Sequence, residues 1–171
     1  MAILPIVKLG HPALRKRAQE IDRITPALKQ LAANMIETMR VNEGIGLAAN
    51  QVNVLQRMFV IDLSLVDENL EARAYINPRI LSRNGREVME EGCLSIPDVR
   101  ADVERAAIIC VEYQTLDGQT VQETLEGLIA RVFQHEWDHL NGVLFIDHIS
   151  PIQRKLIEPQ LNKIREANSI L

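Results

Sequence analysis

The sequence feature that most constrains this chain is a pair of histidines with a glutamate directly after the first, in the run Gln-His-Glu-Trp-Asp-His at 134–139. On an α-helix, His135 and His139 project from the same face because they are about one turn apart. Two neutral imidazoles in that arrangement can bind one divalent metal ion. Glu136 lies roughly 100° around the helix from His135, so its carboxylate can reach a water on the metal without being a ligand. This H-E-x-x-H pattern is typical of metal-dependent hydrolases, with the glutamate as general base.

The residues around the motif favour a largely buried helix. Gly127 marks its start, and Asn141-Gly142 marks its end, where a left-handed residue is favoured. Apolar residues recur at spacings of three and four: Leu128, Ile129, Val132, Phe133 and Leu140. A helix whose two histidines are ordinary core residues would carry the same short motif, so the rest of the chain has to decide between the two interpretations.

The length and composition predict a single soluble domain over residues 1–171. The chain is 47% hydrophobic and 25% charged, which is ordinary for a globular protein. Its net charge of −4 gives no basic surface for DNA, and no stretch is long and apolar enough to span a membrane. Residues 1–5 lack the features of a signal peptide, and two cysteines do not form a disulfide framework. We therefore expect a cytoplasmic, reducing location and neither DNA nor membrane as a partner.

The local patterns predict an N-terminal helix and several strands. Thr25 and Pro26 resemble an N-cap and a first helical residue, and an apolar stripe continues the helix to about Val41. The remaining predictions are strands at 58–63, 75–78, 80–82, 108–115 and 120–125, with hairpin turns at Asn84-Gly85 and Asp117-Gly118.

Three segments are predicted to be less regular. Residues 43–51 contain two glycines and small residues, which favours a loop at a substrate groove that ends in the amide of Gln51. Residues 90–97 read as an irregular or edge segment ended by a proline. A C-terminal helix begins at Ser150-Pro151, and Pro159 inside it should break or kink it.

A catalytic metal needs a third protein ligand, and Cys93 is the best candidate. Gly92 before it relaxes the backbone, and the segment is short. Cys110 lies within a predicted apolar strand, which is typical of a small hydrophobic residue. A structural zinc site that uses both cysteines is disfavoured, because such sites prefer pairs two to four residues apart.

Three motifs in this order closely resemble those of bacterial peptide deformylases: Gly-Ile-Gly-Leu-Ala-Ala-Asn-Gln at 44–51, Glu-Gly-Cys-Leu-Ser at 91–95, and the H-E-x-x-H run. The resemblance covers essentially the whole chain. It implies an α+β fold in which antiparallel β-sheets surround a central H-E-x-x-H helix, with an N-terminal and a C-terminal helix. It also implies removal of the formyl group from the initiator methionine of new polypeptides, with release of formate. The implied cofactor is one divalent metal ion, natively Fe²⁺, with Zn²⁺ or Ni²⁺ after isolation.

The resemblance assigns roles to individual residues. The metal ligands would be Cys93, His135 and His139, and Glu136 would be the general base and acid. Gln51 and the backbone N–H of Leu94 would donate to the oxyanion. The residues expected to hold the peptide or line the methionine pocket are Ile45, Gly46, Met89, Arg100, Leu128 and Val132. N-formylmethionyl polypeptides would be the substrate partners. The resemblance leaves contact with the ribosome undecided, because Pro159 would interrupt the C-terminal helix.

Two other functions are considered. An H-E-x-x-H metallopeptidase usually takes its third ligand from downstream, where His148 and Glu158 are the nearby candidates. A non-catalytic metal or peptide-binding module would not need Glu136 as a base. The position of Cys93 upstream favours the deformylase.

Overall fold

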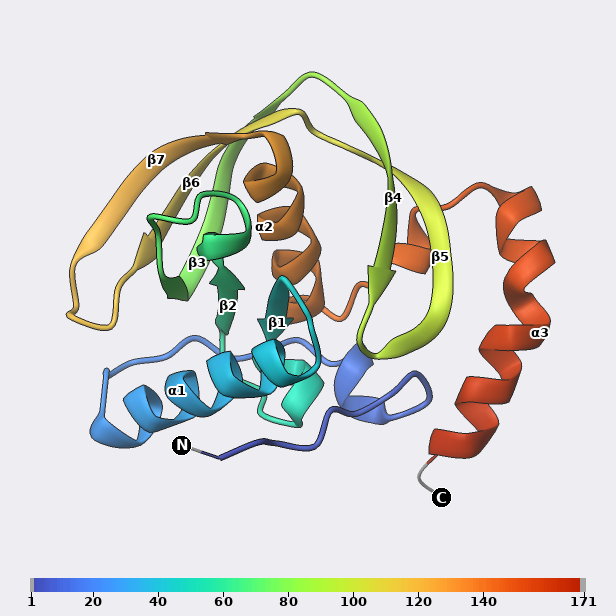
Figure 1. Ribbon diagram of the computed structural model, residues 1–171, viewed down its shortest axis with the longest axis horizontal. Helices are drawn as coiled ribbons and strands as arrows, with labels where there is room; N and C mark the ends of the chain where they lie inside the picture. Colours follow the sequence, from blue (N-terminus) through green and yellow to red (C-terminus); the bar gives the residue numbers. More distant parts are fainter. Residues whose placement is uncertain (1, 170–171) are drawn as a thin grey trace.

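The computed structural model describes residues 2–169 and contains two antiparallel sheets (Figure 1). The larger sheet has five strands in the order β1-β2-β3-β6-β7, and the smaller sheet pairs β4 with β5. The strand bounds are β1 Gly46–Ala48, β2 Met58–Asp62, β3 Ala72–Asn84, β4 Glu87–Cys93, β5 Ile96–Arg105, β6 Ile108–Gln114 and β7 Thr120–Glu126.

Three α-helices complete the fold: α1 Pro26–Val41, α2 Gly127–Leu140 and α3 Pro151–Asn168. Short 3₁₀ helices lie at η1 Pro12–Arg15, η2 Ala49–Val52, η3 Leu63–Leu65 and η4 Phe145–Asp147. The motif helix α2 lies between the two sheets, and α3 lies beside β5 at the edge of the molecule (Figure 1). The expected α+β fold, with antiparallel sheets around a central helix, is confirmed. None of the helices described in residues 2–169 is long and apolar enough to cross a membrane.

Aromatic packing fixes α2 on the larger sheet. The Phe133 ring lies edge-on to Phe59 of β2, with ring centroids 5.0 Å apart, and edge-on to Tyr75 of β3 at 5.6 Å. All three side chains are fully buried. Buried aromatic pairs contribute both area and orientation, so this contact sets the rotation of α2 about its axis.

Local sequence signals explain the helix ends. The Thr25 hydroxyl accepts a hydrogen bond from Leu28 N at 3.1 Å, and the Ser150 hydroxyl accepts one from Gln153 N at 3.2 Å. Gly127 begins α2 and Gly142 follows its end, with φ values of +68° and +74°, a region that glycine adopts most readily. The predicted bounds of α1 and α2 and the β6–β7 hairpin are confirmed.

Two predicted turns and loops are wrong. Asn84-Gly85 does not close a hairpin, because β3 pairs with β6 while the chain leaves the turn to enter the other sheet as β4. Residues 43–51 are not one loop: residues 46–48 form β1, which pairs with β2, and η2 follows.

The prediction of an irregular or edge segment at residues 90–97 is partly confirmed, and the prediction that Pro159 would break the C-terminal helix is wrong. Residues 87–93 form the edge strand β4, whose pairing with β5 shifts register between Gly92 and Cys93, but Pro97 lies inside β5 and does not end the segment. The helix α3 is 18 residues long and continues through Pro159 without interruption. Pro159 is exposed, so water can solvate the Lys155 carbonyl that loses its helical donor.

Candidate metal centre and active site

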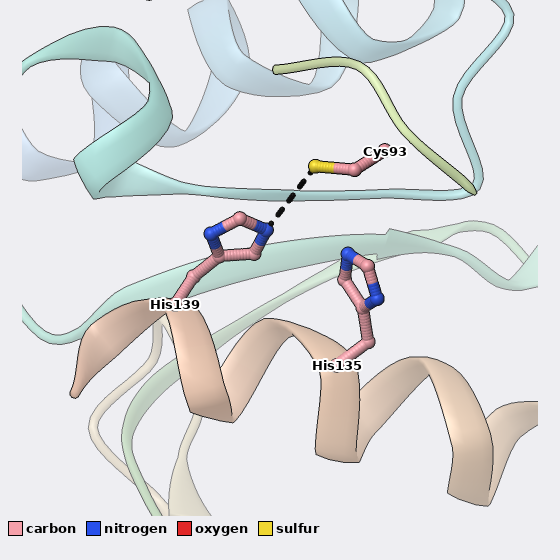
Figure 2. A group of neighbouring side chains, drawn as sticks. All are labelled: Cys93, His135 and His139. Atoms are coloured by element: carbon pink, nitrogen blue, oxygen red, sulfur yellow. Dashed lines mark hydrogen bonds between the residues drawn. The ribbon is translucent and has the colours of Figure 1, made fainter. Parts of the chain in front are cut away.

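Three side chains that can bind a metal converge at the centre of the fold. Figure 2 shows His135 and His139 projecting from the same side of α2 toward Cys93, which ends β4. One ligand atom from each residue lies within 4.8 Å of the others. The Cys93 Sγ atom is 3.4 Å from His139 Nε2. A thiolate with two imidazoles suits a divalent transition metal and leaves a coordination position open, so the residues present fit a catalytic metal ion.

A buried charge network orients His135. We call the four residues Glu91, Arg105, Arg131 and Asp138 the Glu91 network. His135 Nδ1 lies 2.9 Å from Glu91 Oε1. A carboxylate can only accept, so Nδ1 carries a proton, and Nε2 is the ring nitrogen left to bind a metal.

Two arginines hold the Glu91 carboxylate. Arg105 donates to both of its oxygens, at 2.6 and 2.9 Å, and Arg131 donates to Oε2 at 2.5 Å. Burial alone would raise the pKa of Glu91, but the hydrogen bonds from His135 and Arg105 lower this pKa far below its usual range. Glu91 therefore stays ionised and holds the His135 ring in place.

The two histidines have opposite electrostatic environments. Burial lowers the pKa of His139, and the positive charges of His135 and Arg105 lower it further. Burial would also lower the pKa of His135, but the carboxylate of Glu136 and hydrogen bonds to Cys93 and Glu91 raise it to about 10. His139 is therefore a neutral imidazole, as metal binding requires.

Glu136 lies on α2 next to the candidate ligands and against Gly46. A Cβ atom at position 46 would come within 2.6 Å of Glu136 Oε2, so only glycine fits there. The other oxygen, Oε1, is buried and has no hydrogen-bond partner among the residues described. Burial raises the pKa of Glu136 to about 7, although the positive charges of His135 and Arg105 oppose this shift. A carboxylate with such a pKa can exchange a proton near neutral pH.

Hydrogen bonds anchor both the carbonyl end and the amide end of the Gln51 side chain. Its Oε1 accepts from Ala48 N at 2.9 Å, and its Nε2 donates to Ser95 Oγ at 3.1 Å. The same Nε2 lies 3.5 Å from Cys93 Sγ. Because Gln51 is buried and held at both ends, its amide nitrogen stays beside Cys93 at the candidate metal site.

A cavity of about 510 Å³ opens onto this site. It brings together every substrate-binding residue expected from the sequence: Ile45, Gly46, Met89, Arg100, Leu128 and Val132. Gln51, Leu94, Cys93, His135 and Glu136 line the same cavity. A cleft of this volume is large enough to bind a small ligand.

The residues considered for a metallopeptidase lie outside the cluster. His148 binds Asp138 at 2.8 Å, and Glu158 binds Arg154 and Arg165 at 3.1 and 2.7 Å. Neither residue belongs to the group of metal-binding side chains found among residues 2–169. Cys93 is the residue that completes the set.

Comparison with known proteins identifies the family. The family model of polypeptide deformylases matches residues 3–155. The chain belongs to the polypeptide deformylase family. The family's established role is hydrolysis of the formyl group from N-terminal methionine, and its members are metal-dependent.

Individual peptide deformylases are similar to this chain over nearly their full lengths. A peptide deformylase of Mesorhizobium japonicum is 47% identical over 165 residues, which cover 96% of this chain and 94% of that protein. Peptide deformylase 2 of Xanthomonas campestris is 43% identical over 169 residues, which cover 97% and 98%. The crystal structure of a peptide deformylase from Legionella pneumophila superposes with a TM-score of 0.88 at 38% identity and covers 97% of each chain.

Sequence reasoning assigned no role to the Glu91 network of this deformylase. Glu91 and Ser95 stand inside the motif around Cys93, so their proximity to Cys93 was a usable signal. Arg105 and Arg131 carry no local signal, because they reach Glu91 across 14 and 40 residues of chain. Such pairs become evident only when the sheets and α2 are placed together.

Proposed function

We propose that this deformylase binds its metal through Cys93, His135 and His139, and cleaves the formyl amide with Glu136 as the proton carrier. The observation that carries the proposal is the convergence of these four side chains beside one cavity. Catalytic metal sites commonly combine three protein ligands with one open position, and this set supplies three.

We assign Fe²⁺ as the native ion, with Zn²⁺ or Ni²⁺ able to occupy the same donors. When bound, the metal lowers the pKa of water and polarises the formyl oxygen. Thiolate and imidazole donors suit all three ions, so metal analysis of protein purified without oxygen is the measurement that separates them. The carboxylate of Glu91 keeps the His135 ring oriented in each case.

Glu136 takes the proton from the attacking water and gives it to the departing amine. Support comes from its buried position, its unpartnered oxygen and its raised pKa of about 7. Gly46 lets the Glu136 carboxylate pack closely against β1, because no Cβ occupies that space. One residue can serve both steps, because the base of the first step is protonated for the second.

Gln51 and the backbone N–H of Leu94 donate to the oxygen that becomes negative during attack. Gln51 is fixed before the substrate arrives, and preorganised donors in a buried site stabilise developing charge strongly. Leu94 follows Cys93 directly in the turn between β4 and β5 and lines the cavity. The position of both residues at the cavity supports this assignment.

The cavity holds the methionine and the start of the chain. Apolar side chains from β4, α2 and the segment before β1 surround the methionine, and Gly46 and Arg100 flank the peptide. The apolar residues are Ile45, Met89, Leu128 and Val132. The substrates are formylated nascent polypeptides, so we place the reaction in the cytoplasm. Contact with the ribosome is compatible with α3, whose exposed Ile152 and Leu156 lie on an uninterrupted helix.

Formate release tests the proposal. We expect formyl-Met peptides to be hydrolysed, and acetyl-Met peptides to react far more slowly, because the site accommodates a carbonyl that bears hydrogen. An internal peptide bond in the same peptide serves as the control and should survive. Cleavage of internal bonds without formate release would contradict the proposal and favour a metallopeptidase.

A further inference from the structure

A continuous path of hydrogen bonds leads from the candidate ligand His135 to the surface at His148. His148 follows η4, and its Nε2 donates to Asp138 Oδ2 at 2.8 Å. The same oxygen accepts from Arg105 Nη1 at 2.9 Å. Arg105 then holds Glu91, and Glu91 accepts from His135 Nδ1. Each link in the path involves a charged group, and such hydrogen bonds are the stronger ones.

His148 is the exposed end of an otherwise buried path. The side chains of Arg105, Glu91 and Asp138 are 4%, 6% and 13% exposed, whereas that of His148 is 38% exposed. The Glu91 network itself balances two carboxylates with two guanidinium groups. None of the residues given a role in the reaction requires a histidine at position 148, so this side chain needs a separate explanation.

We propose that His148 is a positioning residue for the metal ligand His135 and acts through the Glu91 network. The proposal rests on the proposed function, because it takes His135 to be a ligand. His148 does not touch substrate or metal. It fixes the Asp138 carboxylate against Arg105, and the fixed fork of Arg105 in turn sets the angle of the Glu91 carboxylate.

The expected effect of losing His148 depends on how many donors remain on each carboxylate. Without His148, Asp138 Oδ2 keeps Arg105 as its remaining side-chain donor and is free to rotate toward solvent. Arg105 would follow and loosen one of the two arginine contacts on Glu91. Arg131 still holds Glu91 Oε2, so the loss is partial. A direct partner of a metal-binding histidine typically contributes about 10–100-fold in affinity, and a residue further out should contribute less.

Two substitutions of His148 by an amide residue differ in the length of the side chain that carries the donor. In His148→Gln, the amide nitrogen lies the same number of bonds from the backbone as Nε2 of the histidine. In His148→Asn, the amide nitrogen lies one bond closer to the backbone. We expect His148→Asn to weaken Co²⁺ binding roughly 3–10-fold, below the range for direct partners, and to shift the visible absorption of bound Co²⁺. His148→Gln should stay within about twofold of the unaltered protein, since it retains the donor. His11→Asn alters the histidine that caps η1, outside the network, and should change neither readout.

A double-mutant cycle tests the route. In an Asp138→Asn background, His148→Asn should cause no additional loss of Co²⁺ affinity, because contacts in one chain are not additive. The proposal is overturned if His148→Gln and His148→Asn bind Co²⁺ with the same affinity, or if His148→Asn has the same affinity as His11→Asn. It is also overturned if His148→Asn causes its full loss of affinity in the Asp138→Asn background. Failure of the unaltered protein to bind Co²⁺ through Cys93 would instead contradict the proposed function.

Discussion

Helices α2 and α3 are both amphipathic, yet the fold uses them in opposite ways. Helix α2 has 14 residues and buries eight of them, including polar Gln134, Glu136 and His139. Helix α3 has 18 residues and, within its described length, buries Leu161 alone. Polar groups become reactive in α2 because the two sheets exclude water around them. In α3, even a proline is tolerated because water reaches the backbone.

The largest contrast between the helices should come from their glutamates. Glu136→Gln keeps the shape and removes the proton acceptor, so turnover should fall by roughly 10²–10⁴, the usual contribution of a general base. Metal content should not change, since Glu136 is not a ligand. The matched change on α3 is Glu158→Gln, which disturbs a partly exposed ion pair and should leave turnover unchanged. Formate release and metal content should be measured on the same samples. If Glu136→Gln keeps its metal and stays active, the proton-transfer role given to Glu136 is wrong.

Stability should differ between the helices almost as strongly. Phe133→Ala removes a fully buried ring from α2 and should lower the free energy of unfolding by about 3–5 kcal/mol. Leu156→Ala on α3 removes a side chain that is 74% exposed and should change this free energy by less than about 0.5 kcal/mol. Urea unfolding of both variants provides the measurement. Equal losses would mean that α3 is packed as tightly as α2.

A smaller effect is expected at Pro159. Pro159→Ala restores a donor for the Lys155 carbonyl and should raise the free energy of unfolding by at most roughly 2 kcal/mol, after subtracting the entropy that proline removes from the unfolded chain. Hydrogen exchange should slow in α3 while turnover stays the same. A loss of protection in α3 would show that the proline conformation is required there.

Local sequence signals were sufficient for features that depend on neighbouring residues, such as a tight turn or the start of a helix. Asp117-Gly118 predicted the β6–β7 hairpin, and Gly127 predicted the start of α2. Strand β5 was missed because Pro97 and charged residues interrupt the apolar pattern, although Val99, Ala101 and Val103 alternate toward the core. Asn84-Gly85 was misread because turn chemistry specifies a reversal but not which strand pairs across it.

The candidate site divides in the same way. The ligands and Glu136 were predictable, because motif spacing sets their geometry on α2. Glu91 could have been suspected from its motif, but Arg105, Arg131 and their partners depend on contacts between the smaller sheet and α2. Pro159 failed as a helix breaker because sequence alone did not indicate that α3 has little to bury. Long-range placement was therefore the missing information in each case.

Metal content of two cysteine variants tests the central claim that Cys93 joins the histidines of α2 in one metal centre. Cys93 ends β4 beside His139, whereas half-buried Cys110 lies in β6, opposite Ser82 and Thr124. After identical dialysis, Cys93→Ser should lose most of its metal, and Cys110→Ser should retain about one ion per chain, as one catalytic site requires. Full metal occupancy in the Cys93 variant, with loss in the Cys110 variant, would contradict the account.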